Sequence, residues 1–211
     1  MNGLSGFESA DQYRQALENF RKKYVEDWKA WLDCGDKGIN DKLKQFLEIL
    51  KGWGICRCNL PGGVTAEFNE HKFSNLNGIC GKLQDYDLRS FSGDKRVEEC
   101  LWNIWSELEG ICTNKSINIM IASKATMLLT NGSIGPAFDS TVMKRIGYTN
   151  NYKKDFDQWI KLLRTVAEDM LQFEKNIGNN IEQITPAPFN IIKLGRLYDM
   201  ALGPRERDEG F

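Results

Sequence analysis

The chain has 211 residues, of which 41% are hydrophobic and 27% are charged, and its formal net charge at pH 7 is −1. This composition is typical of a globular protein and excludes the disordered and fibrous classes. The nearly balanced charge excludes a strong overall positive field of the kind that recruits a polyanion, but it is compatible with a local basic face.

The sequence gives no sign of a membrane span or of export. No stretch of 18 apolar residues occurs, and the first fifteen residues lack the basic and apolar regions of a secretory signal. The cysteines are scattered along the chain, at Cys34, Cys56, Cys58, Cys80, Cys100 and Cys112. We therefore expect a cytoplasmic protein with reduced thiols.

Apolar residues at three- and four-residue spacing predict helices along most of the sequence. The first helical stripe covers 8–32 and ends at the glycine-containing segment 34–38, and a second helix is predicted over 40–52. Residues 52–63, GWGICRCNLPGG, are rich in glycine and include a proline. They predict a loop, which is a candidate seam between two helical lobes.

The second half of the sequence continues the helical pattern after a segment, 64–92, that gives no clear prediction. No stretch alternates like a strand. We predict an all-α, compact multi-helix globule that forms a single domain over 1–211. Its remaining helices are predicted over 94–110, 116–130, 139–146, 152–176 and 188–202.

One lysine lies on an apolar helix face. On a regular helix over 116–130, Lys124 shares a stripe with Ile117, Ile121 and Leu128, and apolar residues cover much of the remaining surface. Such a helix is usually buried, so its lysine must pair, extend to the edge of the helix, or lose its proton. A buried, deprotonated lysine is a nucleophile, whereas a lysine that reaches solvent needs no function.

An aspartate opens the next predicted helix. In DSTVMKRIG, Asp139 is the predicted N-cap, basic residues occupy the last turn, and Gly147 ends the helix. An N-cap aspartate needs no other role. However, the preceding GPAF is apolar and Lys124 lies one helix away, so Asp139 is also a candidate for a poised, partly desolvated catalytic carboxylate.

Residues 123–129, SKATMLL, and 136–147, PAFDSTVMKRIG, together resemble the helix-hairpin-helix DNA glycosylase superfamily. In that family a lysine-bearing helix is followed by a loop and by an aspartate that opens the next helix. The resemblance implies a compact, all-helical enzyme without a cofactor that excises a damaged or modified base from DNA. It implies a catalytic role for Asp139 and, as in bifunctional members, a nucleophilic role for Lys124.

The sequence departs from this family pattern at three points. In the family, a hairpin of the form G-h-G-x-K-[TV]-A opens the lysine-bearing helix. Here the residues before Lys124 are Met120, Ile121, Ala122 and Ser123, so the hairpin glycines are missing. The interval between the lysine and the aspartate is 15 residues, which is shorter than usual in the family. No four-cysteine arrangement for an iron–sulfur cluster follows. A non-catalytic DNA- or protein-binding protein on a glycosylase-like scaffold is therefore an alternative, and a helical toxin or abortive-infection protein is a third.

Cleavage of a glycosidic bond builds positive charge on the sugar, which a carboxylate such as Asp139 stabilises. A deprotonated Lys124 could attack the anomeric carbon and form a Schiff base. The target base must leave the stack and enter a pocket, and aromatic residues suit the lining of such a pocket. The candidates are Trp53, Trp102, Trp105 and Phe138, although aromatic residues at helical spacing also fit a core.

A local excess of basic residues follows Asp139. Residues 141–164 hold six basic residues against Asp155 and Asp157, a pattern that suits phosphate contacts and equally suits a solvated helix face. The DNA-binding candidates are Lys144, Arg145, Lys153 and Lys154. The predicted partner is duplex DNA with a flipped base, bound by a monomer that serves in repair or in defence against phage DNA with modified bases.

Metal chemistry has weak support in the sequence. Zinc could in principle be bound by Cys56, Cys58, His71 and Cys80, but these residues lack the usual C-x2-4-C pairing. The single histidine also argues against two-histidine metal centres. We therefore predict no metal and no cofactor.

Overall fold

The computed structural model describes residues 3–35, 37–55, 68–112, 116–148 and 155–205. Within these ranges the chain forms ten α-helices and no strand, which confirms the all-α prediction. The α-helices are α1 (Ala10–Glu18), α2 (Lys22–Leu32), α3 (Ile39–Gly52), α4 (Glu70–Gly81), α5 (Lys95–Glu107), α6 (Ile119–Leu129), α7 (Ser140–Arg145), α8 (Phe156–Ile177), α9 (Ile181–Ile184) and α10 (Leu194–Leu202). Three short 3-10 helices are η1 (Leu4–Gly6), η2 (Leu88–Ser90) and η3 (Phe189–Ile191).

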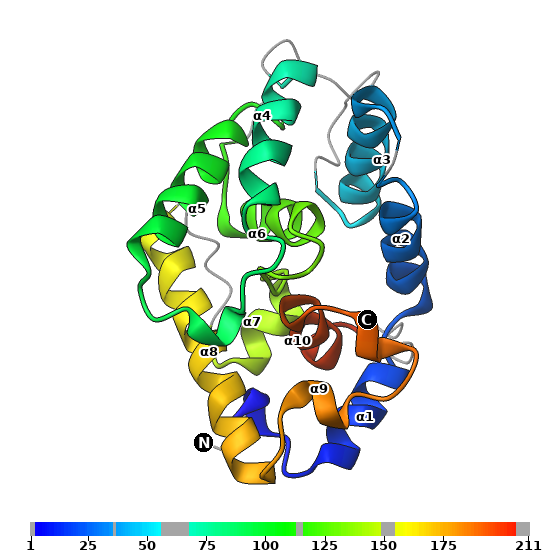
Figure 1. The fold of residues 1–211 in the computed structure, drawn as a ribbon, viewed down its shortest axis with the longest axis vertical. Helices are drawn as coiled ribbons and strands as arrows, with labels where there is room; N and C mark the ends of the chain where they lie inside the picture. Colours follow the sequence, from blue (N-terminus) through cyan, green and yellow to red (C-terminus); the bar gives the residue numbers. More distant parts are fainter. Residues whose placement is uncertain (1–2, 36, 56–67, 113–115, 149–154, 206–211) are drawn as a thin grey trace.

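Helix α6 lies in the middle of the molecule and contacts α3, α4, α5 and α8 (Figure 1). Every residue of α6 except Met120 is buried. Because the helix is apolar on nearly all sides, it has no face that prefers solvent, and it packs as the core element that its sequence predicts. The buried residues around it form one hydrophobic cluster that includes side chains from Leu4 to Leu202.

The predicted helix over 8–32 is two helices, α1 and α2. The chain breaks between them because the backbone around Phe20 pairs with the C-terminal segment: Phe20 forms an antiparallel bridge with Arg205, and the amide of Arg21 donates to the carbonyl of Pro204 at 3.3 Å. A continuous apolar stripe does not reveal such a break, because the apolar spacing continues from α1 into α2.

Two other helices differ from the sequence prediction. Helix α10 starts at Leu194 rather than at 188, because the proline-containing segment before it forms the short helix η3. Helix α4 lies in the segment 64–92, whose pattern predicts no clear element, and it buries only Phe73, Leu76 and Cys80. Residues 52–55 of the predicted loop and seam form the end of α3 and the turn after it, and residues 56–63 lie outside the described residues.

Within the described ranges, no helix is both long enough and apolar enough to cross a bilayer. Cys34, Cys80 and Cys100 are free thiols, but Cys112 takes part in a disulfide, so the prediction of reduced thiols throughout is wrong for this residue. Scattered cysteine positions along a sequence do not reveal which of them meet after folding, and this is why the prediction failed.

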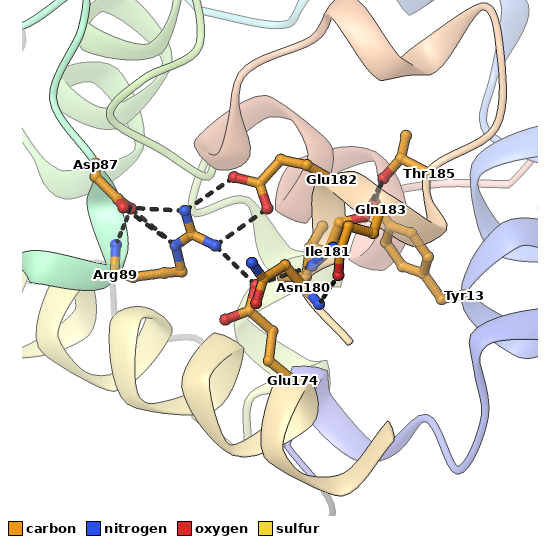
Figure 2. A network of polar contacts seen from close by, with 9 residues as sticks. All are labelled: Tyr13, Asp87, Arg89, Glu174, Asn180, Ile181, Glu182, Gln183 and Thr185. Atoms are coloured by element: carbon orange, nitrogen blue, oxygen red, sulfur yellow. Dashed lines mark hydrogen bonds and ion pairs between the residues drawn. The ribbon is translucent and has the colours of Figure 1, made fainter. Parts of the chain in front are cut away.

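An ion-pair cluster on the surface, which we call the Arg89 cluster, joins three elements (Figure 2). Arg89 of η2 binds Asp87, Glu174 of α8 and Glu182 of α9, with contacts of 2.9–3.0 Å. Glu174 also accepts a hydrogen bond from the amide of Ile181 at 2.9 Å. The cluster therefore fixes the turn from α8 into α9, which leads the chain back toward α10.

Candidate active site

A small cavity of about 20 Å³ lies where α6, α10 and the start of α7 meet the N-terminal helices. It contains both ionisable residues that the sequence singled out, Lys124 and Asp139. Its lining consists of Phe20, Tyr24, Trp53, Lys124, Met127, Ala137, Asp139, Arg196, Asp199 and Pro204. Four of these ten side chains carry ionisable charge, an unusual density for a site inside a hydrophobic core.

Lys124 points into the protein. Its side chain is only 8% exposed, and Nζ donates a hydrogen bond of 2.7 Å to the backbone carbonyl of Trp53. The interpretation in which the long side chain carries its amine to solvent is therefore wrong. The carbonyl fixes the position of the amine at the cavity wall, where a substrate carbon could approach it.

Asp139 caps α7 and also lines the cavity. Its Oδ1 accepts hydrogen bonds of 2.9 Å from the amides of both Thr141 and Val142. Its Oδ2 accepts no hydrogen bond from the part of the chain that the structure describes. The cap thus fixes the carboxylate through one oxygen and leaves the other available to a ligand, so the capping role and a catalytic role are compatible.

The turn before Asp139 is held from two sides. The amide of Phe138 donates to Ser123 Oγ at 3.0 Å, and the amide of Ala137 donates to Asp199 Oδ1 at 3.1 Å. Ser123 directly precedes Lys124 on α6, so this first hydrogen bond ties the lysine-bearing helix to the aspartate-bearing turn. The relative positions of Lys124 and Asp139 therefore depend on specific hydrogen bonds as well as on apolar packing.

Arg196 and Asp199 form a buried ion pair on α10, with Arg196 Nη1 2.5 Å from Asp199 Oδ2. Arg196 Nη2 donates to the carbonyl of Tyr24 at 2.8 Å. The guanidinium also lies over the rings of Trp28, Phe20 and Trp53, at 4.9, 5.0 and 5.5 Å from their centroids. These contacts compensate for the loss of water around a cation in the core.

The charges in the cavity influence one another. Burial raises the pKa of Asp199 to about 6, and the carboxylate of Asp139 adds to this increase. Arg196, the amide of Ala137 and Lys124 act in the opposite direction. Burial also lowers the pKa of Arg196, and Asp199 opposes this change. The four residues thus form one coupled set of charges.

Two glycines allow α10 to approach this site. A Cβ atom at Gly195 would lie 2.5 Å from the amide nitrogen of Gly135, and one at Gly135 would lie 2.7 Å from the carbonyl oxygen of Gly195. No side chain fits between the two backbones at these distances. The pair of glycines therefore sets the close contact that delivers Arg196 and Asp199 to the cavity.

Of the four candidate aromatic residues, Trp53 lines the cavity and the other three lie elsewhere in the described structure. Phe138 is fully buried in the core. Trp105 and the 52% exposed Trp102 lie on α5, where both pack edge-on against Phe156, at the start of α8. Trp53 also donates from Nε1 to Asp27 Oδ2 at 2.8 Å, which fixes its ring.

The basic candidates are divided between two parts of the sequence. Lys144 and Arg145 are exposed on the last turn of α7, the helix that Asp139 caps. Arg145 also donates to the carbonyl of Ala201 at 3.4 Å. Lys153 and Lys154 lie outside the described residues, as do Cys56 and Cys58. Among the residues that are described, no three His, Cys, Asp or Glu side chains gather into a metal-binding group.

Sequence reasoning missed Arg196 and Asp199. The signal was present, because LGRLYDMAL is an apolar segment that contains an arginine and an aspartate three residues apart. The same argument that singled out Lys124 on its apolar helix applies to this pair, which would be expected to bond across one turn inside the core.

No family model, curated protein or solved structure matches this chain.

Proposed function

We propose that this protein is a DNA glycosylase that excises a damaged or modified base by cleaving the N-glycosidic bond. The observation that carries the proposal is that one cavity is lined by Asp139, Lys124 and Trp53. Base excision with an oxocarbenium-like transition state needs a carboxylate, an amine adds the covalent route of bifunctional enzymes, and aromatic residues suit a base pocket. The resemblance in residues 123–147 adds a reason to choose this reaction over others.

Asp139 would act on the sugar. As the base leaves, positive charge develops at the anomeric carbon, and an anionic Oδ2 held at the cavity wall would stabilise it or activate a water molecule. Because Oδ1 is fixed by two backbone amides, the carboxylate needs little reorganisation during the reaction. This pre-organisation is the largest contribution that we assign to a single side chain.

Lys124 would act as a nucleophile in a bifunctional version of the reaction. When neutral, its amine can donate one hydrogen to the Trp53 carbonyl and keep its lone pair for attack on the anomeric carbon. The attack displaces the base, and ring opening gives a Schiff base between Nζ and the sugar. Elimination of the 3′ phosphate from this adduct then cuts the strand.

The cavity has a volume of about 20 Å³ in this structure, which is room for about one water molecule. Small-molecule sites commonly occupy about 300–1,000 Å³, so a flipped base would enter only if the elements around the cavity move apart. Trp53 lines the cavity, and Lys144 is exposed on α7, the helix that Asp139 caps, where a phosphate could approach it. Whether the protein serves in repair or in defence against modified phage DNA depends on which base is released.

A non-catalytic DNA- or protein-binding role is the second candidate, and one observation favours it. The helix that carries Lys124 starts with Asn118, whose side chain accepts a hydrogen bond of 3.0 Å from the amide of Ile121. In a glycine hairpin such amides would be offered to a DNA phosphate. At this helix start one of them is already occupied, so DNA would need other phosphate contacts.

Base release separates the two candidates. Purified protein is incubated with duplexes that carry oxidised, alkylated or deaminated bases, and with phage DNA that contains modified cytosines, and alkali then reveals abasic sites. We expect alkali-labile sites on at least one substrate, and their loss in Asp139→Asn. A folded protein that releases no base from any of these substrates would favour the binding role.

The role of Lys124 needs a separate assay. Borohydride reduction during the reaction should trap a covalent complex between the wild-type protein and DNA. The Lys124→Met variant should lose both the trapped complex and the strand cutting, while it retains base release through Asp139. If Lys124→Met still forms the trapped complex, another amine is the nucleophile.

A further inference from the structure

Asp199 is the second carboxylate of the cavity, and both of its oxygens are engaged. Oδ1 accepts from the amide of Ala137 at 3.1 Å, and Oδ2 lies 2.5 Å from Arg196 Nη1. The residue is 4% exposed. Asp199 therefore connects α10 to the turn that carries Asp139.

We propose that Asp199 is a positioning residue for Asp139: it holds the turn that presents the Asp139 carboxylate to the cavity, and it sets a second titratable charge beside that carboxylate. This inference rests on the proposed glycosylase function for its effect on catalysis. Its structural and electrostatic content can be tested without any activity.

The geometry of the turn supports the positioning role. Both backbone polar groups of Ala137 are hydrogen-bonded. Its N–H donates to Asp199, and its carbonyl accepts from the amide of Asp139 at 2.7 Å. A change at Asp199 therefore reaches the backbone of Asp139 through one residue. A displacement of about 1 Å at a reacting group can cost roughly 10²-fold in rate.

The electrostatic part of the proposal involves groups from several elements packed around Asp199. Burial and the Asp139 carboxylate favour the protonated form of Asp199, whereas Arg196 and Lys124 favour the ionised form, and the resulting pKa is about 6. Asp199 therefore changes its charge near pH 6. The charged and titratable groups that act on it or on its ion-pair partner are Asp139, Lys124, Arg196, Asp27 and Tyr24.

The first experiment follows the ¹³C carboxyl resonance of Asp199 through a pH titration. Asp139→Asn removes the neighbouring charge but retains a good N-cap residue, so this variant should fold. We expect the pKa of Asp199 to fall in Asp139→Asn. The control Asp155→Asn makes the same change at the N-cap of α8, where Asp155 accepts amide hydrogen bonds from Asp157 and Gln158, and should leave the titration of Asp199 unchanged.

An Asp199 titration that is identical in the wild type and in Asp139→Asn would overturn the proposed electrostatic relation. This result does not depend on any variant of Asp199, so it remains decisive even if Asp199→Asn does not fold. It also does not depend on base release, so the proposed function can fail while the relation between the two carboxylates holds.

The second experiment measures single-turnover base release and DNA affinity separately. Asp199→Asn should lower the rate by about 10–10²-fold while the Kd for DNA stays within about threefold, and Asp199→Glu should recover part of the rate because it restores the carboxylate. Asp169→Asn is the matched control. Asp169 lies on α8, and its Oδ2 accepts a hydrogen bond of 2.8 Å from the hydroxyl of Tyr198, which lies on α10 as Asp199 does. Asp169 does not line the cavity. Equal rates in Asp199→Asn and Asp169→Asn would contradict a positioning role.

Discussion

Arg89 and Arg196 are both held by carboxylates, but their surroundings are opposite. The side chain of Arg89 is 19% exposed and binds three carboxylates, which raise the pKa of its guanidinium. The side chain of Arg196 is 2% exposed, binds one carboxylate, and leaves its Nε without a hydrogen-bond partner in the described structure. The Arg89 cluster is saturated and joins η2, α8 and α9, as a structural connection would.

The Arg196–Asp199 pair lies against a cavity, and within the described residues only the Nε of Arg196 in this pair has no hydrogen-bond partner. Desolvation acts against the charge of both members, so this region costs free energy that a purely structural core would avoid. Buried charge that is incompletely satisfied beside open space is a common property of functional sites. The comparison therefore separates a part of the molecule that stabilises the fold from a part that we expect to act on a ligand.

The largest effect on stability should come from breaking the buried pair. Arg196→Met leaves Asp199 without its cation in the core, and we expect a loss of about 3–5 kcal/mol in the free energy of unfolding. Arg89→Met removes a cluster that is partly exposed and should cost only about 1–2 kcal/mol. Urea denaturation measures both values, and equal losses would remove the distinction between the two regions.

The pH dependence of stability should reveal Asp199. Its pKa is raised from an ordinary 3.8 to about 6 in the folded protein, so the folded state binds the proton more tightly than the unfolded state. The contribution of Asp199 to stability is therefore complete below pH 4 and declines as the pH rises through about 6. With about 1.4 kcal/mol per pKa unit, the total decline is about 3 kcal/mol.

The measurement for this prediction compares wild type with Asp199→Asn. Relative to Asp199→Asn, the wild type should have a larger free energy of unfolding at pH 4 than at pH 7. A difference that stays constant across this range would mean that Asp199 does not titrate there.

A smaller effect should follow from the glycine contact beneath the site. Gly195→Ala would place a Cβ atom 2.5 Å from the backbone of Gly135, so α10 must move, and we expect a loss of about 1–3 kcal/mol. Gly78→Ala is the matched control, because this exposed glycine lies within α4 with open space around it. It should stabilise the protein by about 0.5–1 kcal/mol. Thermal unfolding distinguishes the two signs, and a stabilising Gly195→Ala would contradict the close approach.

The smallest effect should appear at the basic rim. Lys144→Gln removes one exposed charge from the last turn of α7 and should reduce the slope of log K against log salt concentration by about 1. Lys175→Gln makes the same change in the last turn of α8, and should leave the slope unchanged. Equal slopes in both variants would mean that the α7 end does not contact phosphates.

The sequence predicted the parts of this site that depend on local pattern. Lys124 stands out on an apolar helix, and Asp139 stands out as an N-cap after an apolar turn, and the structure brings both to one cavity. Asp199 could not be assigned to the same site from the sequence, because its contact with Ala137 joins residues 62 positions apart. Trp53 was recognised as a candidate, but its role as the carbonyl partner of Lys124 depends on the tertiary fold.

The fold shows the same division. The helical class follows from apolar spacing, which is a local property, and the helix boundaries at α3, α5 and α7 lie close to those predicted. The break between α1 and α2 depends on the chain returning at Pro204 and Arg205, so no local pattern announces it. Long-range contacts therefore determine both the missed boundary and the missed site residues.

The most direct test makes the same substitution at the N-cap aspartates of two different helices, α7 and α8. Asp139→Asn and Asp155→Asn each replace an N-cap aspartate whose Oδ1 accepts hydrogen bonds from two backbone amides. Single-turnover base release should fall by about 10²–10³-fold in Asp139→Asn and remain at the wild-type rate in Asp155→Asn, with both variants folded. Equal rates in the two variants would mean that Asp139 is a helix cap and nothing more.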